Sequence, residues 1–230
     1  MKRIIALALV MTLACLSLVS CGEKMGEGAC EYLETRDTDG RDIKYVEICV
    51  KGYGKMVVLL DATTAPITVA NFLSLVEDGF YKGLTFHRIM DNFMIQGGDP
   101  EGTGRGGSAT KIKGEFDSNG HENDISHKHG VISMARSGGD ASNNYGYDTA
   151  SSQFFICNAD ATSLDGKYAA FGYVVEGLSV VDAITAGTLE KAQKYYGTSY
   201  LSWLYSGNGA LDAAIQPTIR YIKVLDSWEK

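Results

Sequence analysis

Short apolar runs recur along the chain, separated by polar segments that are rich in glycine. The runs contain mainly β-branched, aliphatic and aromatic residues, and turn residues bound them, a pattern that is typical of β-strands. Between the first two runs, the segment KGYGK is a hairpin signal. The pattern predicts eight short strands, near Tyr45–Val50, Met56–Leu60, Thr85–Ile89, Phe93–Gln96, Val131–Ala135, Gln153–Cys157, Ala169–Val175 and Ile219–Leu225.

Two further segments have the period of a helix. In APITVANFLSLVEDG, Pro66 suits a first helical turn and Gly79 suits a stop. A second short helix is expected around Val180–Ala186. Eight short strands with two helices and long glycine-rich loops favour a mainly-β fold, a closed antiparallel barrel. The apolar positions of the first helix recur at i, i+3, i+4 and i+7, as Val69, Phe72, Leu73 and Val76.

Residues 1–20 have the pattern of a secretory signal rather than of a folded element. Two basic residues precede an uncharged run from Ile4 to Val19, which is shorter than the ~20 residues that a transmembrane helix needs. The run ends in LVSC, which resembles the lipobox of bacterial lipoproteins, with Cys21 as the acylated residue. One alternative is a plain signal peptide with an incidental cysteine. Another is acylation at Cys15, which is disfavoured because Thr12 occupies the aliphatic position of its box.

The chain after the signal divides into a polar segment and a patterned one. Residues 21–43 are mostly polar and charged, and we expect them to form a lipidated N-terminus and flexible tether. Residues 44–226 carry the strand and helix patterns and are predicted to be the folded domain. The expected localisation is extracytoplasmic, as a lipoprotein anchored to a membrane of the bacterial cell envelope through its N-terminal lipid.

Charge and cysteine content exclude some functions. The formal net charge of −7 argues against nucleic acid as a partner, because phosphate binding needs a basic face. Of five cysteines, Cys30, Cys49 and Cys157 follow the lipobox, with neither a CxxC motif nor metal-like spacing. Cys49 and Cys157 lie in apolar runs and are predicted to be buried hydrophobic residues. An oxidising compartment would permit a disulfide, which the sequence does not specify.

The sequence lacks the motifs that several common classes of enzyme and binding site require. The chain has neither a GxSxG elbow nor an HExxH motif. His121, His127 and His129 lie close in sequence, but no carboxylate or cysteine joins them at a familiar zinc spacing. His87 has the chemistry of a general base but no nucleophile to activate. GTGRGG at residues 102–107 lacks the strand–turn–helix context of a nucleotide loop. We therefore expect no metal and no cofactor.

The stretch GLTFHRIMDNFMIQGGD places one arginine, Arg88, among aromatic and aliphatic residues. One interpretation is an amphipathic strand whose arginine reaches water. The other is a mostly apolar pocket with a single charged donor directed into it.

Four motifs in order resemble the cyclophilin family of peptidyl-prolyl cis–trans isomerases: FHRIMDNFMIQGGD, GVISMARS, SSQFFICNA and SLDGKYAAFG. The resemblance runs from about Tyr45 to Leu225. It implies an eight-stranded barrel capped by two helices, with a substrate groove on its outer face. It also implies that the segment 187–215, between the second helix and the last strand, is an insertion. We expect this aromatic-rich segment to be a helical elaboration packed on the barrel, with a partner-binding patch as the alternative.

The resemblance carries site residues over by position. Arg88 matches the family's catalytic arginine, and Gln96 is expected to act beside it. Arg136 stands where many members have asparagine, and Tyr168 stands at a histidine of the familiar eukaryotic forms. The proline-ring pocket is matched by Phe93, Met94, Phe155 and Leu164. The remaining substrate-binding residues are expected to be Phe86, Ala135, Arg136, Ser137, Gln153 and Tyr168.

The implied activity is cis–trans isomerisation of Xaa-Pro bonds in proline-containing polypeptides. For a chain with a secretory signal, the expected role is to assist the folding of exported proteins, as a monomer. One alternative is a chaperone module that binds proline-containing segments with little turnover. Another is a solute-binding surface lipoprotein, which explains the lipobox but not the four motifs.

Overall fold

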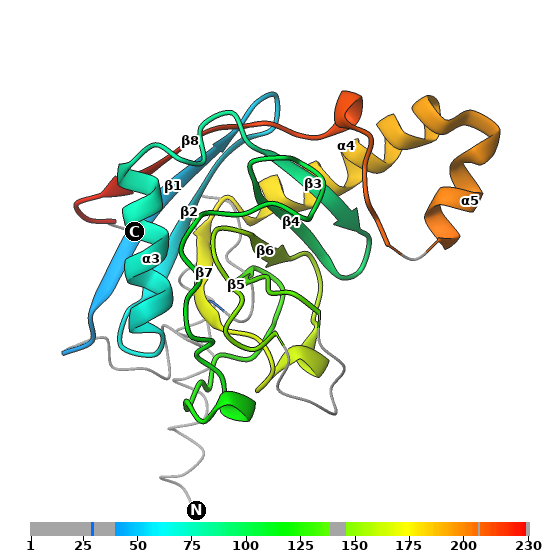
Figure 1. Ribbon diagram of the computed structural model, residues 1–230. Coiled ribbons are helices and arrows are strands. Elements are labelled where there is room, and N and C mark those ends of the chain that lie inside the picture. The colour runs from blue at the N-terminus through cyan, green and yellow to red at the C-terminus, as the bar shows by residue number, and fades with distance from the viewer. Residues whose placement is uncertain (1–28, 30–39, 139–145, 207, 229–230) are drawn as a thin grey trace, which may run out of the picture.

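Eight antiparallel strands form one curled sheet, with a helix near each end of it (Figure 1). The structure is a computed structural model that describes residues 40–138, 146–206 and 208–228, together with Ala29. The strands occur in the spatial order β3-β4-β6-β5-β7-β2-β1-β8. Their bounds are β1 Ile43–Val50, β2 Gly54–Asp61, β3 Thr85–Met90, β4 Met94–Asp99, β5 Val131–Met134, β6 Phe154–Cys157, β7 Ala170–Glu176 and β8 Ile219–Leu225. All eight predicted strands are confirmed, with ends that differ by a few residues.

The sheet is open, so the predicted closed barrel is wrong. The edge strands β3 and β8 meet only around the bridge between Thr85 and Thr218, where three backbone hydrogen bonds join residues 83–86 to residues 217–219. Beyond that point, residues 209–211 lie along β3 in place of a closing strand. These residues belong to the predicted insertion, and they occupy the backbone groups that a closed ladder would use.

The first helix, α3 (Pro66–Glu77), lies where the periodicity predicted it. It buries Val69, Phe72 and Val76 against the inner face of the sheet. No side chain of its own caps its N-terminus. Instead, the buried carboxylate of Glu115 accepts hydrogen bonds from the backbone N–H groups of Ile67 and Thr68, at 3.0 and 2.7 Å. A negative charge at this end satisfies free N–H groups and complements the helix dipole.

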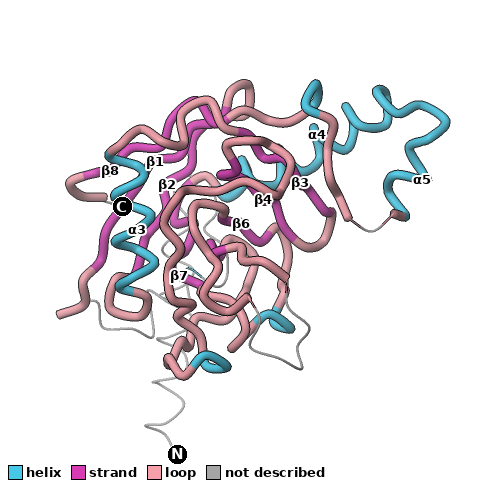
Figure 2. Tube along the Cα trace, in the orientation of Figure 1, coloured by secondary structure: helices cyan, strands magenta, loops and turns pink. Residues whose placement is uncertain are grey.

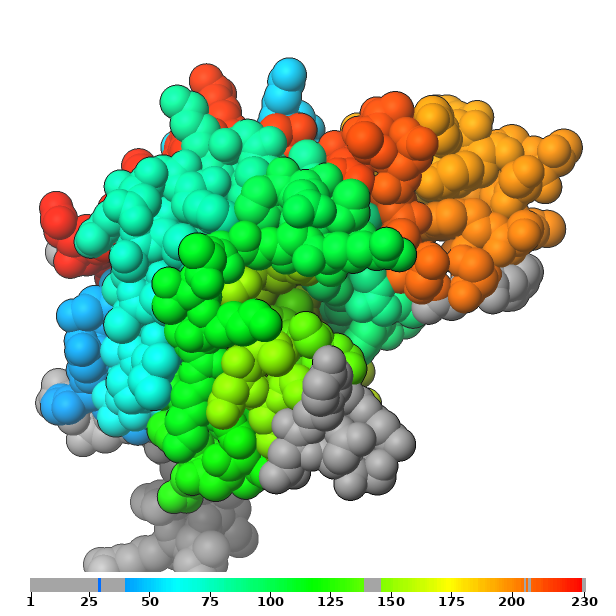
Figure 3. Space-filling model, viewed as in Figure 1, coloured from blue at the N-terminus to red at the C-terminus, as the bar shows by residue number. Residues whose placement is uncertain are grey.

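The second helix, α4 (Leu178–Tyr196), is much longer than predicted. It was expected to end near Ala186, yet it continues through Gly187, where a Cβ atom would lie 3.0 Å from the Tyr53 ring and glycine leaves room for that ring. A 3₁₀ turn at Gly197–Ser199 and the short helix α5 (Tyr200–Tyr205) follow. The insertion is therefore helical, and it projects beyond the sheet as a separate lobe (Figures 2 and 3). The remaining 3₁₀ turns are Asp117–Asn119, Thr162–Leu164 and Ala213–Ile215.

Strand alternation gives the sheet two differently used faces. On the inner face, Ile95, Phe154 and Ile156 join the main core with α3 and α4. On the outer face, Met94 and Phe155 form a separate small cluster with neighbouring loops. Because neighbouring side chains of a strand point to opposite faces, the consecutive pairs Met94-Ile95 and Phe154-Phe155 serve both clusters.

The structure tests the predictions for two of the cysteines but not those for the signal and most of the tether. Cys49 and Cys157 are buried, as predicted, and both are free thiols. Cys21, Cys30 and the residues predicted as signal and most of the tether lie outside the described residues. None of the helices in the described part of the chain is both long enough and apolar enough to span a membrane.

Candidate active site

The register of three strands brings Arg88 and its predicted partners together. Arg88 on β3 lies directly opposite Gln96 on β4, and Gln96 lies opposite Phe155 on β6. Residues that face each other across an antiparallel pair have neighbouring side chains on one face of the sheet. The side chains that are far apart in sequence therefore meet on the outer face.

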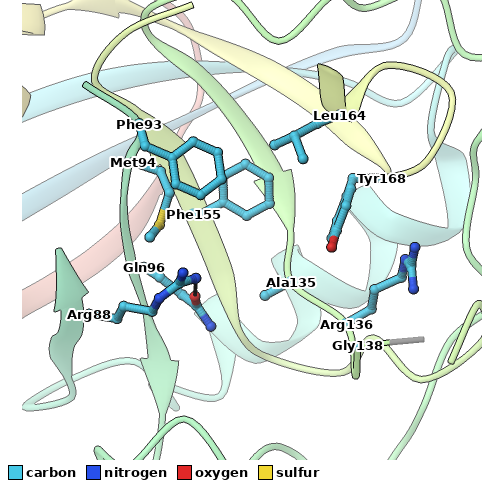
Figure 4. Close-up of a pocket in the computed structure, with 10 residues that line it drawn as sticks. All are labelled: Arg88, Phe93, Met94, Gln96, Ala135, Arg136, Gly138, Phe155, Leu164 and Tyr168. Carbon is cyan, nitrogen blue, oxygen red and sulfur yellow. Dashed lines mark hydrogen bonds between the residues drawn. The ribbon is translucent and has the colours of Figure 1, made fainter. Parts of the chain in front are cut away.

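The guanidinium of Arg88 is held by three groups. Nη1 donates to Oε1 of Gln96 at 3.1 Å, and Nη2 lies 3.0 Å from Sδ of Met90 (Figure 4 shows the Gln96 bond). Nε donates to the backbone carbonyl of Asn208 at 2.5 Å. Burial lowers the pKa of Arg88, and the nearby Tyr168 opposes that shift. Since arginine begins from a very high pKa, the group remains a fixed, charged donor.

A relay of amides supports Gln96 from behind. Its Nε2 donates to Oε1 of Gln153 at 2.9 Å, and Gln153 donates in turn to the carbonyl of Gly106 at 2.7 Å. The loop that carries Gly106 is folded around Asp99, whose carboxylate accepts the N–H groups of Glu101 and others nearby. Thus the orientation of the Gln96 amide, and with it the Nη1 contact of Arg88, is set by a hydrogen-bonded chain.

The other end of the site is apolar. Phe155 forms its floor and is almost fully buried, with Tyr168 edge-on to it at 6.0 Å between ring centroids. The ring of His127 stacks beneath Phe155 at 5.9 Å. Phe93 is fixed at the rim because its backbone N–H donates to Oδ1 of Asn158 at 2.7 Å. A flat apolar group can therefore lie on Phe155.

Between the two ends is a cavity of about 260 Å³ (Figure 4). This is smaller than the ~300–1,000 Å³ of pockets for drug-sized ligands, so a small ring or side chain suits it. Arg88 provides a positive charge at one side of the cavity and Arg136 at the other, with aromatic rings between the two sides. The lining residues are Arg88, Phe93, Met94, Gln96, Ala135, Arg136, Gly138, Phe155, Leu164 and Tyr168.

Three of the predicted substrate-binding residues do not line the cavity. Gln153 lies one layer behind it, bonded to Gln96. Ser137 is exposed beside it, and its backbone N–H donates to Thr149 Oγ1 at 2.9 Å. Phe86 is fully buried on the opposite face, packed edge-on against Phe154. We therefore assign Phe86 to the core.

A shift in strand register explains the position of Phe86. Residues two apart in a regular strand share a face, so Phe86 and Arg88 were expected to point the same way. The ladder between β3 and β4 is irregular here, since Phe86 pairs with Gly97 and Arg88 with the adjacent Gln96. The additional residue on β3 is a β-bulge, which reverses the alternation and turns Phe86 inward.

Sequence reasoning missed three contributors to the site. Met90, which contacts Arg88, was open to prediction because it lies two residues further along the same strand face. Gly138 lines the cavity without a side chain, and nothing in the sequence marks it. Asn208 acts through its backbone carbonyl, so its side chain gives no signal.

The histidines are engaged elsewhere. His127 bonds to Asp165 and Ser133, and His129 to Asp182. In the part of the chain that the structure describes, no three His, Cys, Asp or Glu side chains are arranged to hold a metal ion. His87 is buried outside the cavity, and burial lowers its pKa, opposed by nearby Asp99.

Comparisons with known proteins agree on one family. Residues 45–199 match the family model described as cyclophilin type peptidyl-prolyl cis-trans isomerase. A peptidyl-prolyl cis-trans isomerase of Helicobacter pylori is 43% identical over 138 residues, which cover 59% of this chain and 77% of the relative. Peptidyl-prolyl cis-trans isomerase B of Bacillus subtilis is 41% identical over 133 residues, covering 58% and 85%.

A solved structure supports the same assignment. The cyclophilin type peptidyl-prolyl cis-trans isomerase of Cryptosporidium parvum matches with a TM-score of 0.60 and 26% identity, over 81% of this chain and 99% of that one. Its structure in the presence of the dipeptide Ala-Pro matches with a TM-score of 0.58 and 25% identity. The chain therefore belongs to the cyclophilin-type family and is a peptidyl-prolyl cis–trans isomerase.

Proposed function

We propose that the protein isomerises Xaa-Pro bonds at the cavity beside Arg88, on exported proteins that are folding outside the cytoplasm. The observation that carries this proposal is a fixed guanidinium at the edge of a small apolar cavity. Such a site suits a reaction that breaks no bond and transfers no proton.

The barrier to rotation about an Xaa-Pro bond comes from amide resonance and is ~18–20 kcal/mol. In the twisted transition state the lone pair is localised on the prolyl nitrogen, where a donor can bind it. An N–H of Arg88 supplies that donor, while the proline ring lies on Phe155 between Phe93 and Leu164. Because this contact is stronger with the twisted amide than with the planar one, it accelerates the reaction rather than merely binding substrate.

The effect required from each contact is modest. A tenfold acceleration needs ~1.4 kcal/mol of selective stabilisation. One charged hydrogen bond in a partly buried site, together with ordering of the ring, is of sufficient size to supply several factors of ten. Tyr168 and Ala135 complete the wall along which the flanking peptide runs.

The experiment that tests the activity is exchange spectroscopy on a proline-containing tetrapeptide with the purified full-length protein. We expect cis–trans exchange to accelerate in proportion to enzyme concentration. The alternative function, a chaperone module, predicts that the protein binds the peptide without accelerating exchange. Binding with uncatalysed exchange rates would therefore favour the chaperone and contradict the proposal.

The extracytoplasmic location is a separate part of the proposal. It is supported by the basic start, the short apolar run and the LVSC sequence that ends at Cys21. We expect the mature protein to begin at a lipidated Cys21 and to fractionate with membranes. Cys21→Ser should abolish lipidation, as measured by intact mass, and a mature N-terminus at another residue would contradict the lipobox assignment.

A further inference from the structure

The insertion returns to the sheet along the free edge of β3. We call residues 208–212 the strap. The backbone N–H of Ile89 donates to the carbonyl of Gly209 at 2.9 Å, and the N–H of Leu211 donates to the carbonyl of His87 at 2.9 Å. Together with the bridge between Arg88 and Ala210, these bonds pair the strap antiparallel to β3. The strap therefore flanks Arg88 on the side opposite Gln96 and β4.

The strap fits β3 too closely for a side chain at Gly209. Gly209 is buried and has a φ of +63°, a conformation that favours glycine. A Cβ atom there would lie 2.6 Å from the carbonyl oxygen of Ile89 and would also overlap Met90 Cγ. Since Met90 itself contacts Arg88, the close approach places the strap, Met90 and the guanidinium in one packed unit.

The helical lobe holds the strap from its other side. The indole Nε1 of Trp203 donates to the carbonyl of Ala210 at 2.5 Å. The Trp203 ring stacks on Tyr196 with 5.3 Å between centroids, and the hydroxyl of Tyr196 accepts the backbone N–H of Asp212 at 2.9 Å. Residues of both α4 and α5 thus fix the strap at two points.

The contact of the strap with Arg88 differs in kind from the other two. Gln96 and Met90 bind the terminal nitrogens, whereas the carbonyl of Asn208 binds Nε, where the aliphatic stem joins the planar group. A bond at Nε restrains the rotation of the guanidinium plane about the stem. Three of the five N–H donors are then occupied within the described residues, which leaves one hydrogen on each terminal nitrogen for substrate.

We propose that the strap is a positioning element for Arg88, with the backbone carbonyl of Asn208 setting the plane in which the guanidinium donates to the prolyl nitrogen. The proposal rests on the catalytic role of Arg88 that is part of the proposed function. The match to the family model ends at residue 199, so the strap lies between the matched residues and β8, the last strand of the sheet. Preorganised donors act because their orientation is fixed before the reaction.

The principal test compares two glycine substitutions in the full-length protein. Gly209→Ala adds a methyl group against β3, whereas Gly197→Ala adds one where nothing lies within 4 Å. Both glycines are in the insertion and both have positive φ, +63° and +53°, so alanine is strained at both, and the ψ of −122° at Gly197 makes that control a demanding one. We expect Gly209→Ala to lower kcat about tenfold with KM within about twofold, and Gly197→Ala to change neither by more than about twofold.

A second variant and a direct measurement keep the test decisive if Gly209→Ala folds poorly. Trp203→Phe retains the ring stacked on Tyr196 but removes the N–H that holds Ala210, and we expect kcat to fall about threefold. The ¹⁵N-labelled Nε–H of Arg88 reports the bond itself. Its resonance should be protected from exchange in the wild type and in Gly197→Ala, and lose protection in Trp203→Phe and Gly209→Ala.

The Arg88→Ala background separates the strap from the function of Arg88. If the strap acts through Arg88, adding Gly209→Ala to Arg88→Ala should lower the residual rate by less than about twofold. An equal tenfold loss in that background would overturn the proposal, as would equal activities of the folded Gly209→Ala and Gly197→Ala variants. Full activity of Arg88→Ala would instead refute the catalytic role of Arg88 in the proposed function.

Discussion

The cavity has an arginine at each side, and the two are held by different sets of contacts. Arg88 is held by hydrogen-bond acceptors and a sulfur in contact with its own N–H groups. Arg136 instead lies over three aromatic rings, with its Cζ atom 4.6 Å from the ring centroid of Tyr168, 5.1 Å from Tyr147 and 5.5 Å from Phe116. Two backbone carbonyls also accept from it, that of Lys167 from Nε at 3.1 Å and that of Ser137 from Nη1 at 3.4 Å.

We call Arg88 a directed donor, because the direction of its free N–H groups is fixed. We call Arg136 a placed charge, because it contributes chiefly through the position of its charge. Acceptors in the plane of a guanidinium fix which way its remaining N–H groups point. Ring faces attract the cation above them, typically by ~0.5–1 kcal/mol at exposed sites, but they constrain its in-plane direction only weakly. The carbonyl of Lys167 restrains Arg136 at Nε as that of Asn208 restrains Arg88, but Arg136 lies across the cavity from Arg88 and Gln96. We therefore assign the contact with the reacting bond to Arg88 and a positive potential along the bound peptide to Arg136.

The largest effect is expected from Arg88. Arg88→Ala should lower kcat/KM by about 10²–10³, the usual cost of removing one preorganised donor, while the unfolding midpoint stays nearly constant. The measurement is exchange spectroscopy on a neutral Ala-Pro tetrapeptide. Arg88→Lys is the matched variant, since lysine retains the charge but lacks the fork that Gln96 and Asn208 hold. Wild-type activity of the lysine variant would show that charge alone suffices at this position.

A smaller and substrate-dependent effect is expected from Arg136. Arg136→Gln should lower kcat/KM on a neutral peptide by less than about threefold, because no donor to the reacting bond is lost. On a peptide with glutamate beside the proline, the loss should reach about tenfold at low salt and shrink at high salt, as screening requires. Arg136→Lys should restore most of the preference for the acidic peptide. An equal loss on all peptides, independent of salt, would contradict the assignment of Arg136 as a placed charge.

The sequence predicted one of these arginines more fully than the other. Arg88, Gln96 and the apolar residues were identified because they lie in motifs that resemble a known family, and strand alternation places them on one face. The rings beneath Arg136 come from three separate loops, and no local pattern relates Phe116 and Tyr147 to Tyr168. Contacts between distant loops depend on tertiary packing, which a single sequence does not display.

Backbone groups and register irregularities account for the remaining differences. The bulge that turns Phe86 into the core adds one residue to β3, and no residue type in FHR marks it. The sheet stays open because Gly209 to Leu211 occupy the edge of β3. These residues follow β3 in the chain by more than a hundred residues. The carbonyl of Asn208 would be present whatever side chain the residue carried. Side-chain patterns therefore predicted the elements but not these backbone pairings.

The smallest effect on catalysis is expected from pH. Arg88 remains charged near neutrality, and isomerisation needs no proton transfer, so kcat/KM should vary by less than about twofold between about pH 6 and 9. Stability should behave differently, because burial lowers the pKa of His87 and of His127 from the ordinary value of 6.5. Asp99 opposes the shift at His87, and Asp165 opposes it at His127.

The sign of the stability change follows from proton uptake. Just below pH 6.5 the unfolded chain binds protons at these histidines while the folded protein does not, so the free energy of unfolding falls as the pH falls. The urea midpoint should therefore be lower at about pH 5.5 than at about pH 7.5, and His127→Gln should reduce that difference. Activity of the still-folded fraction should remain constant across the same range. A loss of kcat/KM that follows the titration of His87 would show instead that the charge of His87 controls the activity of its neighbour Arg88. The description of Arg88 as a fixed donor would then be incomplete.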